Sequence, residues 1–362
     1  MFIKAFILKL KVLKNMIKIK ISKKIIVSPN KNILYTMNKI NEEKHYFLLV
    51  VEREKLLGTV SDGDIRRAIL KGSELKDKVL TCMNKNPVTA SLENKNDFYR
   101  LLKSVPSFKK FLPVLDSKKK LKYVLIDEEK NFNKIALIMA GGFGTRFGSK
   151  TKFIPKPLLK VSRKPMLELL LEKLEKFDYE KIFISTHYLH RKIEDFINKR
   201  KSNSDIKILL EKKPLGTAGS INKLKDINFD ILTVINGDIV TDIDLKALNT
   251  FHIEKNNDVT VTVAKHRMQI PYGVIKFDDS QNFIAVEEKP DIFNYVLSGI
   301  YCLNKEIANS VENKKTDMPN IIERSHKKGK KVGVFPIYEY WMDVGNPKDY
   351  RLVNRDRKTK HS

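Results

Sequence analysis

A cluster of glycines and the two basic residues Arg146 and Lys156 share one short stretch of the chain, Ala140–Pro157, which reads AGGFGTRFGSKTKFIPKP. It follows an apolar run typical of a buried strand and precedes a helical pattern. At a glycine-rich turn between a strand and a helix, backbone N–H groups approach phosphate oxygens without a Cβ in the way. The spacing is neither the dinucleotide fingerprint nor the Walker A loop. With Arg146 and Lys156 in the same loop, the turn predicts a site where the phosphates of a nucleoside triphosphate are handled chemically.

Glu211 opens a second loop of small residues, Glu211–Ser220, which reads EKKPLGTAGS. Small side chains let a planar base lie against the backbone. A carboxylate only accepts hydrogen bonds, which suits the N1–H and N2–H₂ donors of guanine and suits a uracil or thymine edge badly. The residue therefore predicts guanine as the base. A surface glutamate beside two lysines is the alternative.

Two aspartates are the candidate metal ligands. Asp238 follows the apolar run 231–235, and a carboxylate at the carboxyl end of a parallel strand lies where open α/β sheets bind ligands. Its partner should be distant in sequence, and Asp343 in the run EYWMDVGNPKDY meets that requirement. Two hard oxygen ligands, completed by triphosphate oxygens and water, suit Mg²⁺. No histidine or cysteine spacing indicates another metal or a covalent intermediate.

The elements that must position these residues alternate between strand and helix from residue 134 to about 358. This alternation predicts an α/β domain with a mixed, mostly parallel sheet covered on both faces. Later strands come without long helices between them, and they are expected as antiparallel additions that wall a second ligand site. The expected strands are 135–139, 181–185, 206–210, 231–235, 259–264, 273–277, 283–287 and 296–303, and the expected helices are 165–176, 189–199 and 218–225.

The glycine-rich stretch resembles the GxGTR…PKP signature of the sugar-phosphate nucleotidyltransferases, and the chain resembles their mannose-1-phosphate guanylyltransferase-like members. The resemblance implies a Rossmann-like, GT-A-like fold and direct attack of a sugar 1-phosphate on the α-phosphate of a nucleotide. It implies Arg146 and Lys156 as catalytic residues and Asp238 and Asp343 as Mg²⁺ ligands. The nucleotide contacts that it implies are Ala140, Gly141, Gly142, Gly144, Thr145, Glu211, Gly216, Thr217 and Ala218.

The resemblance also implies that three runs, PYGVI, VEEKP and LSGIY, bind the sugar phosphate. A backbone amide at Gly273 would reach sugar hydroxyls, Glu288 would accept from a hydroxyl pair, and Lys289 would meet the phosphate. Ser298 and Gly299 would complete the pocket. Many relatives have Asn and a small residue before this last glycine, and the chain departs from them there.

Residues 16–127 form two roughly similar halves, about 16–75 and 76–127. The run LLGTVSDGDIRRAI resembles a CBS motif, so the resemblance implies a small α+β tandem CBS pair that binds an adenine nucleotide and dimerises. Ser61 and Asp64 match the ribose-contacting positions of that motif. A pair that only scaffolds a homo-oligomer is the alternative, and the Asp62–Asp64 run alone would be a turn and helix N-cap.

Composition indicates which partners and which cellular compartment to expect. The 362 residues carry a net charge of +27, but the lysines are spread from end to end without an aromatic-interleaved stripe, so no nucleic-acid partner is expected. Two distant cysteines fit a reducing, cytoplasmic compartment. No apolar run is long enough for stable membrane insertion. Residues 1–15 read as a disordered or misassigned extension, with contact at a membrane surface as the alternative.

The combined prediction is a nucleotidyltransferase that converts GTP and glucosamine 1-phosphate, or mannose or a related hexose 1-phosphate, into a GDP-sugar and diphosphate. The layout resembles the CBS-containing guanylyltransferases of legionaminic acid biosynthesis. A uridylyl- or cytidylyltransferase of the same fold is one alternative. An adenylate-sensing regulatory protein with a non-catalytic transferase domain is another.

Overall fold

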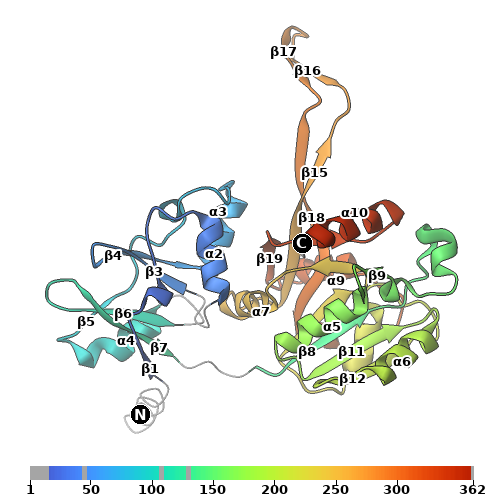
Figure 1. The fold of residues 1–362 in the computed structure, drawn as a ribbon, viewed down its shortest axis with the longest axis horizontal. Coiled ribbons are helices and arrows are strands. Elements are labelled where there is room, and N and C mark those ends of the chain that lie inside the picture. The colour runs from blue at the N-terminus through green and yellow to red at the C-terminus, as the bar shows by residue number, and fades with distance from the viewer. Residues whose placement is uncertain (1–15, 43–46, 106–109, 128–131, 360–362) are drawn as a thin grey trace. The chain divides into compact units, whose positions relative to one another are not determined.

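The computed structural model describes residues 16–42, 47–105, 110–127 and 132–359, so the predicted extension 1–15 lies outside the described residues. The chain divides into two compact units (Figure 1). The first comprises Met1–Phe132 with Lys246–Asn256, and the second comprises Asn133–Leu245 with Asn257–Ser362. In the described part of the chain, no helix has both the length and the apolar character that crossing a membrane requires.

The first unit contains two small sheets built on one plan. In each, a short strand lies parallel to the first strand of an antiparallel hairpin, and a helix connects the two in sequence. The sheet orders are β2-β3-β4 and β1-β7-β6-β5. The elements of the first half are η1 (Lys23–Ile25), β2 (Ile26–Val27), α2 (Ile33–Glu42), β3 (Phe47–Glu52), β4 (Lys55–Ser61) and α3 (Asp62–Leu70). Those of the second are β1 (Met16–Lys20), η2 (Val79–Thr81), β5 (Ala90–Ser91), η3 (Lys95–Asp97), α4 (Phe98–Ser104), β6 (Phe111–Leu115) and β7 (Leu121–Asp127).

The two halves of the first unit share an apolar core. Phe47 from one half stacks on Phe111 from the other, with ring centroids 3.9 Å apart. Leu49 packs in the same cluster as Val124 and Ile126. Burial of this shared surface is what holds the halves together as one unit.

Seven strands form the central sheet of the second unit, in the order β12-β11-β8-β13-β18-β15-β19. The first four run parallel, β18 is antiparallel to both of its neighbours, and β19 is parallel to β15. The predicted mixed, mostly parallel α/β sheet is therefore confirmed. The strands are β8 (Lys134–Met139), β11 (Lys181–Thr186), β12 (Asp205–Leu210), β13 (Ile231–Asn236), β15 (Val259–Gln269), β18 (Asp291–Asn304) and β19 (Val332–Ile337).

Continuous apolar runs build this sheet because both of its faces are covered. Residues 135–138 of β8 are fully buried, as expected for a strand in the middle of a covered parallel sheet. The helices of the second unit are α5 (Met166–Lys176), α6 (His190–Lys199), α8 (Lys305–Asn309), α9 (Met318–Lys327) and α10 (Pro347–Thr359). Helix α7 (Leu245–Glu254) falls almost entirely within Lys246–Asn256, the segment grouped with the first unit. The shorter elements are η4 (Thr145–Thr151), η5 (Lys156–Leu158), β9 (Lys160–Val161), β10 (Lys164–Pro165), η6 (Gly219–Leu224), β14 (Ile239–Thr241) and β20 (Trp341–Asp343).

One expected helix is replaced by a tighter element. The segment 218–225 forms the single 3₁₀ segment η6 rather than an α-helix. Its first residue, Gly219, lies so close to the chain that an added Cβ would be 2.4 Å from the carbonyl oxygen of Lys314. This backbone contact with a distant segment overrides the local helical pattern.

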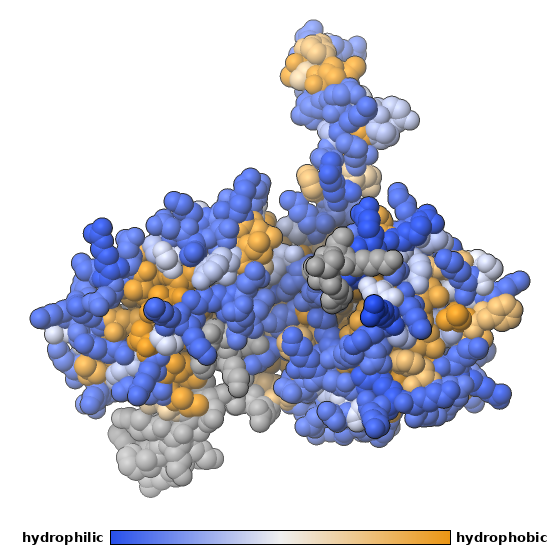
Figure 2. Space-filling view, viewed as in Figure 1, coloured by the Kyte–Doolittle hydropathy of each residue, from blue (hydrophilic) through white to orange (hydrophobic). Residues whose placement is uncertain are grey.

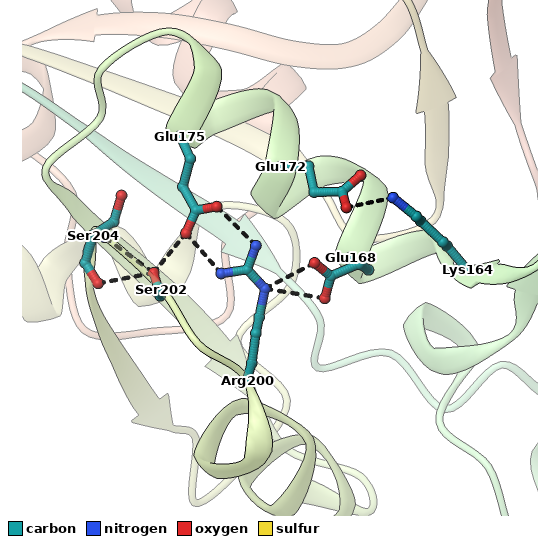
Figure 3. Close-up of polar contacts among 7 residues, drawn as sticks. All are labelled: Lys164, Glu168, Glu172, Glu175, Arg200, Ser202 and Ser204. Atoms are coloured by element: carbon teal, nitrogen blue, oxygen red, sulfur yellow. Dashed lines mark hydrogen bonds and ion pairs between the residues drawn. The ribbon is translucent and has the colours of Figure 1, made fainter.

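Helix α5 is fixed on its outer side by a partly buried ion-pair cluster (Figure 3). Arg200 donates to Glu168 at 2.9 Å and to Glu175 at 2.6 and 2.8 Å, and Ser202 also donates to Glu175. Hydrogen bonding to Arg200 lowers the pKa of Glu175 and, reciprocally, raises the pKa of Arg200. The inner side of α5 buries the apolar residues Met166, Leu167, Leu170, Leu171 and Leu174. The helix that follows the glycine-rich stretch is therefore held from both sides.

A long two-stranded arm leaves the central sheet (Figure 1). β15 and β18 remain paired out to Gln269↔Asp291, and β16 (Gly273–Phe277) pairs with β17 (Phe283–Glu288) at the tip. The first part of β15, Val259–Ala264, is buried, whereas Lys265–Gln269 is exposed. The later strands were expected to wall a second ligand site beside the first. In the structure β16 and β17 instead form a separate sheet at the end of the arm.

Candidate active site

A cavity of about 250 Å³ opens at the carboxyl edge of the parallel strands. It lies where β8, β12 and β13 end, which brings three loops that are distant in sequence to one place. Eight of the residues predicted from sequence line it: Ala140, Gly141, Gly142, Lys156, Glu211, Gly216, Thr217 and Asp238. The remaining lining residues are Met139, Phe143, Pro157, Pro214, Leu215, Asn236 and Gly237.

The glycine-rich loop is held in shape by its own residues. Gly144 has φ +65°, a conformation that disfavours a side chain, and an added Cβ would lie 3.0 Å from Thr151. The Thr151 hydroxyl donates to the Gly144 carbonyl at 2.8 Å. Thr145 and Arg146 follow as exposed residues at the start of η4. The predicted nucleotide residues Gly144 and Thr145 therefore shape the loop beside the cavity rather than line it.

Two carboxylates and two cations gather at one side of the cavity. Lys156 forms an ion pair with Asp238. The pairing of β14 with β20 sets Asp343 opposite Ile239, and the amide of Val344 donates to the Asp238 carbonyl at 3.0 Å. Arg146 approaches from the glycine-rich loop, with its Nη1 3.4 Å from where a Cβ on Gly345 would lie. The structure thus brings together all four predicted catalytic and metal residues.

The environment of Asp343 disfavours its charged form. Partial removal from bulk water, followed by repulsion from Asp238, raises the pKa of Asp343 to about 6, although Lys156 and Arg146 act in the opposite direction. The residue as a whole is nonetheless exposed to solvent. A divalent cation between the two carboxylates would relieve this repulsion.

The two aspartates fit a magnesium ion that is completed by its substrate. Among the described residues, no group of three or more His, Cys, Asp or Glu side chains forms a metal cage. Mg²⁺ is usually bound by one or two carboxylates together with substrate phosphates and water. Asp238 and Asp343 provide that kind of partial, oxygen-only donor set.

Glu211 lies beneath the glycine-rich loop. Only 3% of its surface is exposed, so its interpretation as a surface glutamate is wrong. The hydroxyl of Ser185 donates to one carboxylate oxygen at 2.5 Å, and the amide of Leu215 donates to the other at 2.9 Å. A Cβ on Gly141 would be 3.3 Å from the same carboxylate. This fit accounts for the glycine.

The loop after Glu211 is clamped by the segment before α9. Gly216 has φ +74°, and a Cβ there would lie 2.6 Å from Asp317 Oδ1. The Thr217 amide donates to the same carboxylate at 2.9 Å, and the Ala218 amide donates to the Thr316 carbonyl at 2.9 Å. Ala218 itself is fully buried in the core, so it supports the loop from behind.

Phe143 and Asn236 are two of the seven lining residues that the sequence did not predict as site residues. Phe143 is 47% exposed at the cavity and packs edge-on against His187, with centroids 5.5 Å apart. Asn236 has a buried Oδ1 that accepts no hydrogen bond from any described residue. An aromatic residue inside a glycine run, and a polar residue directly before Gly237 at a strand end, were the available signals.

The predicted sugar-phosphate residues divide into two groups. Gly299 has φ +75° and packs against Asn236 at the cavity, where a Cβ would be 2.6 Å from Asn236 Nδ2. The neighbouring Ser298 is buried, and its hydroxyl bonds to Thr262. Gly273, Glu288 and Lys289 lie far along the arm and do not line the cavity.

Ser61 and Asp64 form a helix cap in the first unit. The Ser61 amide and hydroxyl both donate to Asp64 Oδ2, at 2.8 and 2.7 Å, and the Asp64 amide donates back to the hydroxyl at 3.2 Å. Arg67 pairs with the second carboxylate oxygen. This reciprocal capping box is the turn and N-cap that was the alternative to a ribose site.

A larger cavity of about 970 Å³ is lined by residues of β14, α5 and α10. Its lining includes Lys173 and Arg357, and burial lowers the pKa of Lys173. Arg357 makes a two-point ion pair with Asp242, at 2.8 and 3.1 Å. None of the residues predicted to bind substrate lies in this cavity.

Known proteins resemble the second unit. The model of a family described as Nucleotidyl transferase matches residues 135–360. A probable mannose-1-phosphate guanylyltransferase of Oryza sativa subsp. japonica is 31% identical over 224 residues, and a mannose-1-phosphate guanyltransferase of Schizosaccharomyces pombe is 32% identical over 224 residues. Each alignment covers 59% of this chain and 62% of the relative, so the chain spans about 62% of the length of these relatives. The crystal structure of HddC from Yersinia pseudotuberculosis is 28% identical, with a TM-score of 0.49, and covers 62% of this chain and 99% of HddC.

Proposed function

This chain belongs to the Nucleotidyl transferase family, and from that premise we propose that it transfers a nucleoside monophosphate from a nucleoside triphosphate to a sugar 1-phosphate and releases diphosphate. The observation that carries the proposal is the joining of Arg146, Lys156, Asp238 and Asp343 at one side of a cavity lined by the glycine-rich loop. These residues come from three distant parts of the chain.

The proposed reaction needs no general base from the protein. A sugar 1-phosphate oxygen is already ionised at neutral pH, so it attacks the α-phosphorus directly. The bond between the α-phosphorus and its bridging oxygen breaks, and diphosphate leaves with the electron pair. The protein must position two anions that repel each other and stabilise the charge of the leaving group.

The cations of the site serve this task. Lys156 is paired with Asp238, so its ammonium group is poised to turn to a phosphate when the triphosphate enters. Arg146 is exposed at the edge of the loop, where it can donate to the departing diphosphate. Mg²⁺ bound by Asp238 and Asp343 would supply neutralisation of the phosphate charge.

We propose guanine as the base, and GTP as the favoured donor. Burial of Glu211 beneath the glycine-rich loop supports this choice. A carboxylate offers about four lone-pair sites, and Ser185 and Leu215 use one on each oxygen, so acceptor capacity remains for N1–H and N2–H₂ of guanine. The rice and the yeast relatives are both named as guanylyl- or guanyltransferases acting on mannose 1-phosphate, and these names support the same base.

The acceptor is proposed to be glucosamine 1-phosphate or a related hexose 1-phosphate such as mannose 1-phosphate. The unpartnered Oδ1 of Asn236 supports a sugar that presents a hydroxyl or amino donor beside Gly299. We include in this proposal that the enzyme acts in legionaminic acid biosynthesis, for which GDP-glucosamine would be the product made.

We further propose that residues 16–127, within the first unit, are a tandem CBS pair that takes an adenine nucleotide near Ser61 and Asp64. The repeated plan of its two sheets supports this. Because the two residues already satisfy each other, the nucleotide would have to compete with the capping box. Calorimetric titration of the full chain with AMP and ATP tests the idea, and no heat of binding with either would overturn it.

The transferase proposal is tested by diphosphate release from a panel of four nucleoside triphosphates with several sugar 1-phosphates. We expect GTP to be used and Asp238→Ala to lower the rate by at least ~10³-fold. Asp195→Ala, which removes an exposed carboxylate from α6, is the matched control and should retain the wild-type rate. Turnover of UTP or CTP in place of GTP would reassign the base. Equal, negligible rates for the wild type and Asp238→Ala would instead favour a non-catalytic regulatory protein.

A further inference from the structure

The arm exposes its apolar residues over most of its length. Phe277 is 64% exposed and Phe283 is 68% exposed, and further apolar residues surround them on both strands of the tip (Figure 2). Exposed apolar residues gathered in one place mark an interaction surface, and a two-stranded hairpin without a covering layer is marginally stable in water. The other exposed apolar residues of the arm are Met268, Tyr272, Ile275, Ile284, Val286 and Ile292.

The arm also carries Glu288 and Lys289, two residues of the proposed sugar-phosphate site that do not line the cavity of the same chain. Gly299 lies at the cavity, whereas Glu288 lies eleven residues away along almost continuous strand. At about 3.3 Å per residue, this separation reaches roughly 35 Å. The one register irregularity in the β15–β18 pairing lies between Val261 and Val263, before the exposed part of this fully described arm. The ladder therefore carries Glu288 and Lys289 away from the cavity of the same chain.

A surface that matches the arm lies on the glycine-rich stretch. The tip, residues 270–291, has five carboxylates and only two lysines, in a chain whose net charge is +27. The stretch Ala140–Pro157 has four cationic residues and no carboxylate. It also exposes Phe153, at 72%, and Ile154. Charge and apolar character are thus complementary between the two segments.

We propose that the arm of one copy of this chain docks on the glycine-rich stretch of a second copy and completes the sugar-phosphate half of that copy's site. This inference rests on the transferase function proposed above. An exchange in which each copy receives the arm of the other is two-fold symmetric and closes as a dimer. Docking covers the exposed apolar tip and places carboxylates against a cationic surface.

The exchanged residues have distinct tasks in the composite site. Lys289 provides a cation for the phosphate of the acceptor sugar, and Glu288 accepts hydrogen bonds from its hydroxyls. Each active site then combines the cavity of one chain with the arm of the other. A single chain binds the nucleotide but holds the acceptor poorly.

Complementation between two inactive variants tests this arrangement. Asp238→Ala leaves the arm intact, and the double variant Glu288→Ala, Lys289→Ala leaves the cavity intact. The two full-length chains are co-expressed with different affinity tags, and the heterodimer is isolated through both tags. One of its two composite sites then has both intact halves, so we expect about half of the wild-type rate of diphosphate release from the heterodimer.

The outcomes separate this inference from the proposed function. A wild type without transferase activity on any substrate pair would refute the proposed function itself. An active wild type whose heterodimer has no more activity than either parent would show that the arm acts on its own chain, and failure to recover a heterodimer would equally overturn the exchange.

A second measurement does not depend on the catalytic residues. The variant Phe277→Ser, Phe283→Ser should fold, because both side chains are exposed. We expect its KM for the sugar 1-phosphate to rise about tenfold, its KM for the triphosphate to stay unchanged, and its dimer to weaken in sedimentation velocity. A wild type that sediments as a monomer at assay concentration while it is fully active would overturn the proposal.

Discussion

The cavity and the arm carry the two halves of one proposed reaction, and they are built in opposite ways. The cavity is assembled from the ends of buried parallel strands. Glu211 is held by a hydrogen bond from Ser185, the Thr217 amide by a bond to Asp317, and Asp238 by its ion pair with Lys156. The arm presents Glu288 and Lys289 on exposed strands with few contacts. The fold of one chain therefore fixes the nucleotide-binding half of the site. The sugar-binding half, on the arm, needs a docking partner.

Among the variants that compare the cavity with the arm, the largest effect should come from a cation of the cavity. Arg146→Ala should lower kcat by ~10²–10³-fold with little change in either KM, because the guanidinium is proposed to stabilise charge that develops only in the transition state. Steady-state diphosphate release measures this. Arg191→Ala, at an exposed position of α6, is the control and should behave as wild type. A rise in the KM for GTP at unchanged kcat would place Arg146 in ground-state binding instead.

A cation of the arm should have a different kinetic signature. Lys289→Ala should raise the KM for the sugar 1-phosphate by about tenfold or more, because a charge-assisted contact with phosphate is lost, and should leave the KM for GTP unchanged. Lys276→Ala, on the same arm, removes a lysine that pairs with Glu287 and serves as the control. Equal increases in the KM for GTP and for the sugar 1-phosphate would contradict the assignment of the cavity to the nucleotide and of the arm to the sugar phosphate.

A glycine of the cavity tests how firmly its loop is held. Gly216→Ala puts a Cβ 2.6 Å from Asp317 in a left-handed conformation, so we expect a loss of about 1–3 kcal/mol in the free energy of unfolding and a several-fold higher KM for GTP. Gly329→Ala is the matched control, since Gly329 has φ +71° but no neighbour within 4 Å of its Cβ. Chemical denaturation that finds the same loss in both variants would show that backbone strain alone acts at Gly216.

The smallest effect is a pH dependence of stability at Asp343. Its pKa is raised in the folded protein from 3.8 to about 6, so folding favours the protonated form, and the stability associated with it is lost as the pH rises through 6. In the absence of divalent metal, Asp343→Asn should raise the Tm at pH 8 and leave it nearly unchanged at pH 4. Thermal unfolding at the two pH values measures this difference. An equal gain in Tm at pH 4 and pH 8 would show that the substitution acts through packing rather than through the charge of Asp343.

Much of the cavity was predictable from sequence because its signals are local. Buried runs such as Ile135–Met139 and Ile231–Ile235 read directly as strands, and the carboxyl ends of parallel strands share an edge, so Asp238 could be assigned to the site. The exchange of a helix for η6 could not be foreseen, since it depends on a contact with Lys314. Nor could the sequence pattern of 273–277 and 283–287 predict where that hairpin lies, because alternation specifies a strand but not its direction in space.

Ser61 and Asp64 show the limit of motif reasoning in the other unit. The same spacing matches a ribose-contacting pattern and a capping box, because both use a hydroxyl and a carboxylate three residues apart. The structure contains the capping box. Only a binding measurement distinguishes a cap that also binds a nucleotide from a cap alone.

The central claim is tested most directly by identifying the product. The full-length protein is incubated with GTP, Mg²⁺ and glucosamine 1-phosphate or mannose 1-phosphate, and the mixture is analysed by anion-exchange chromatography and mass spectrometry. We predict a GDP-sugar and diphosphate in equal amounts, with neither formed when the sugar 1-phosphate is omitted. Release of phosphate or diphosphate from GTP without formation of a nucleotide sugar, or no consumption of any nucleoside triphosphate, would contradict the account.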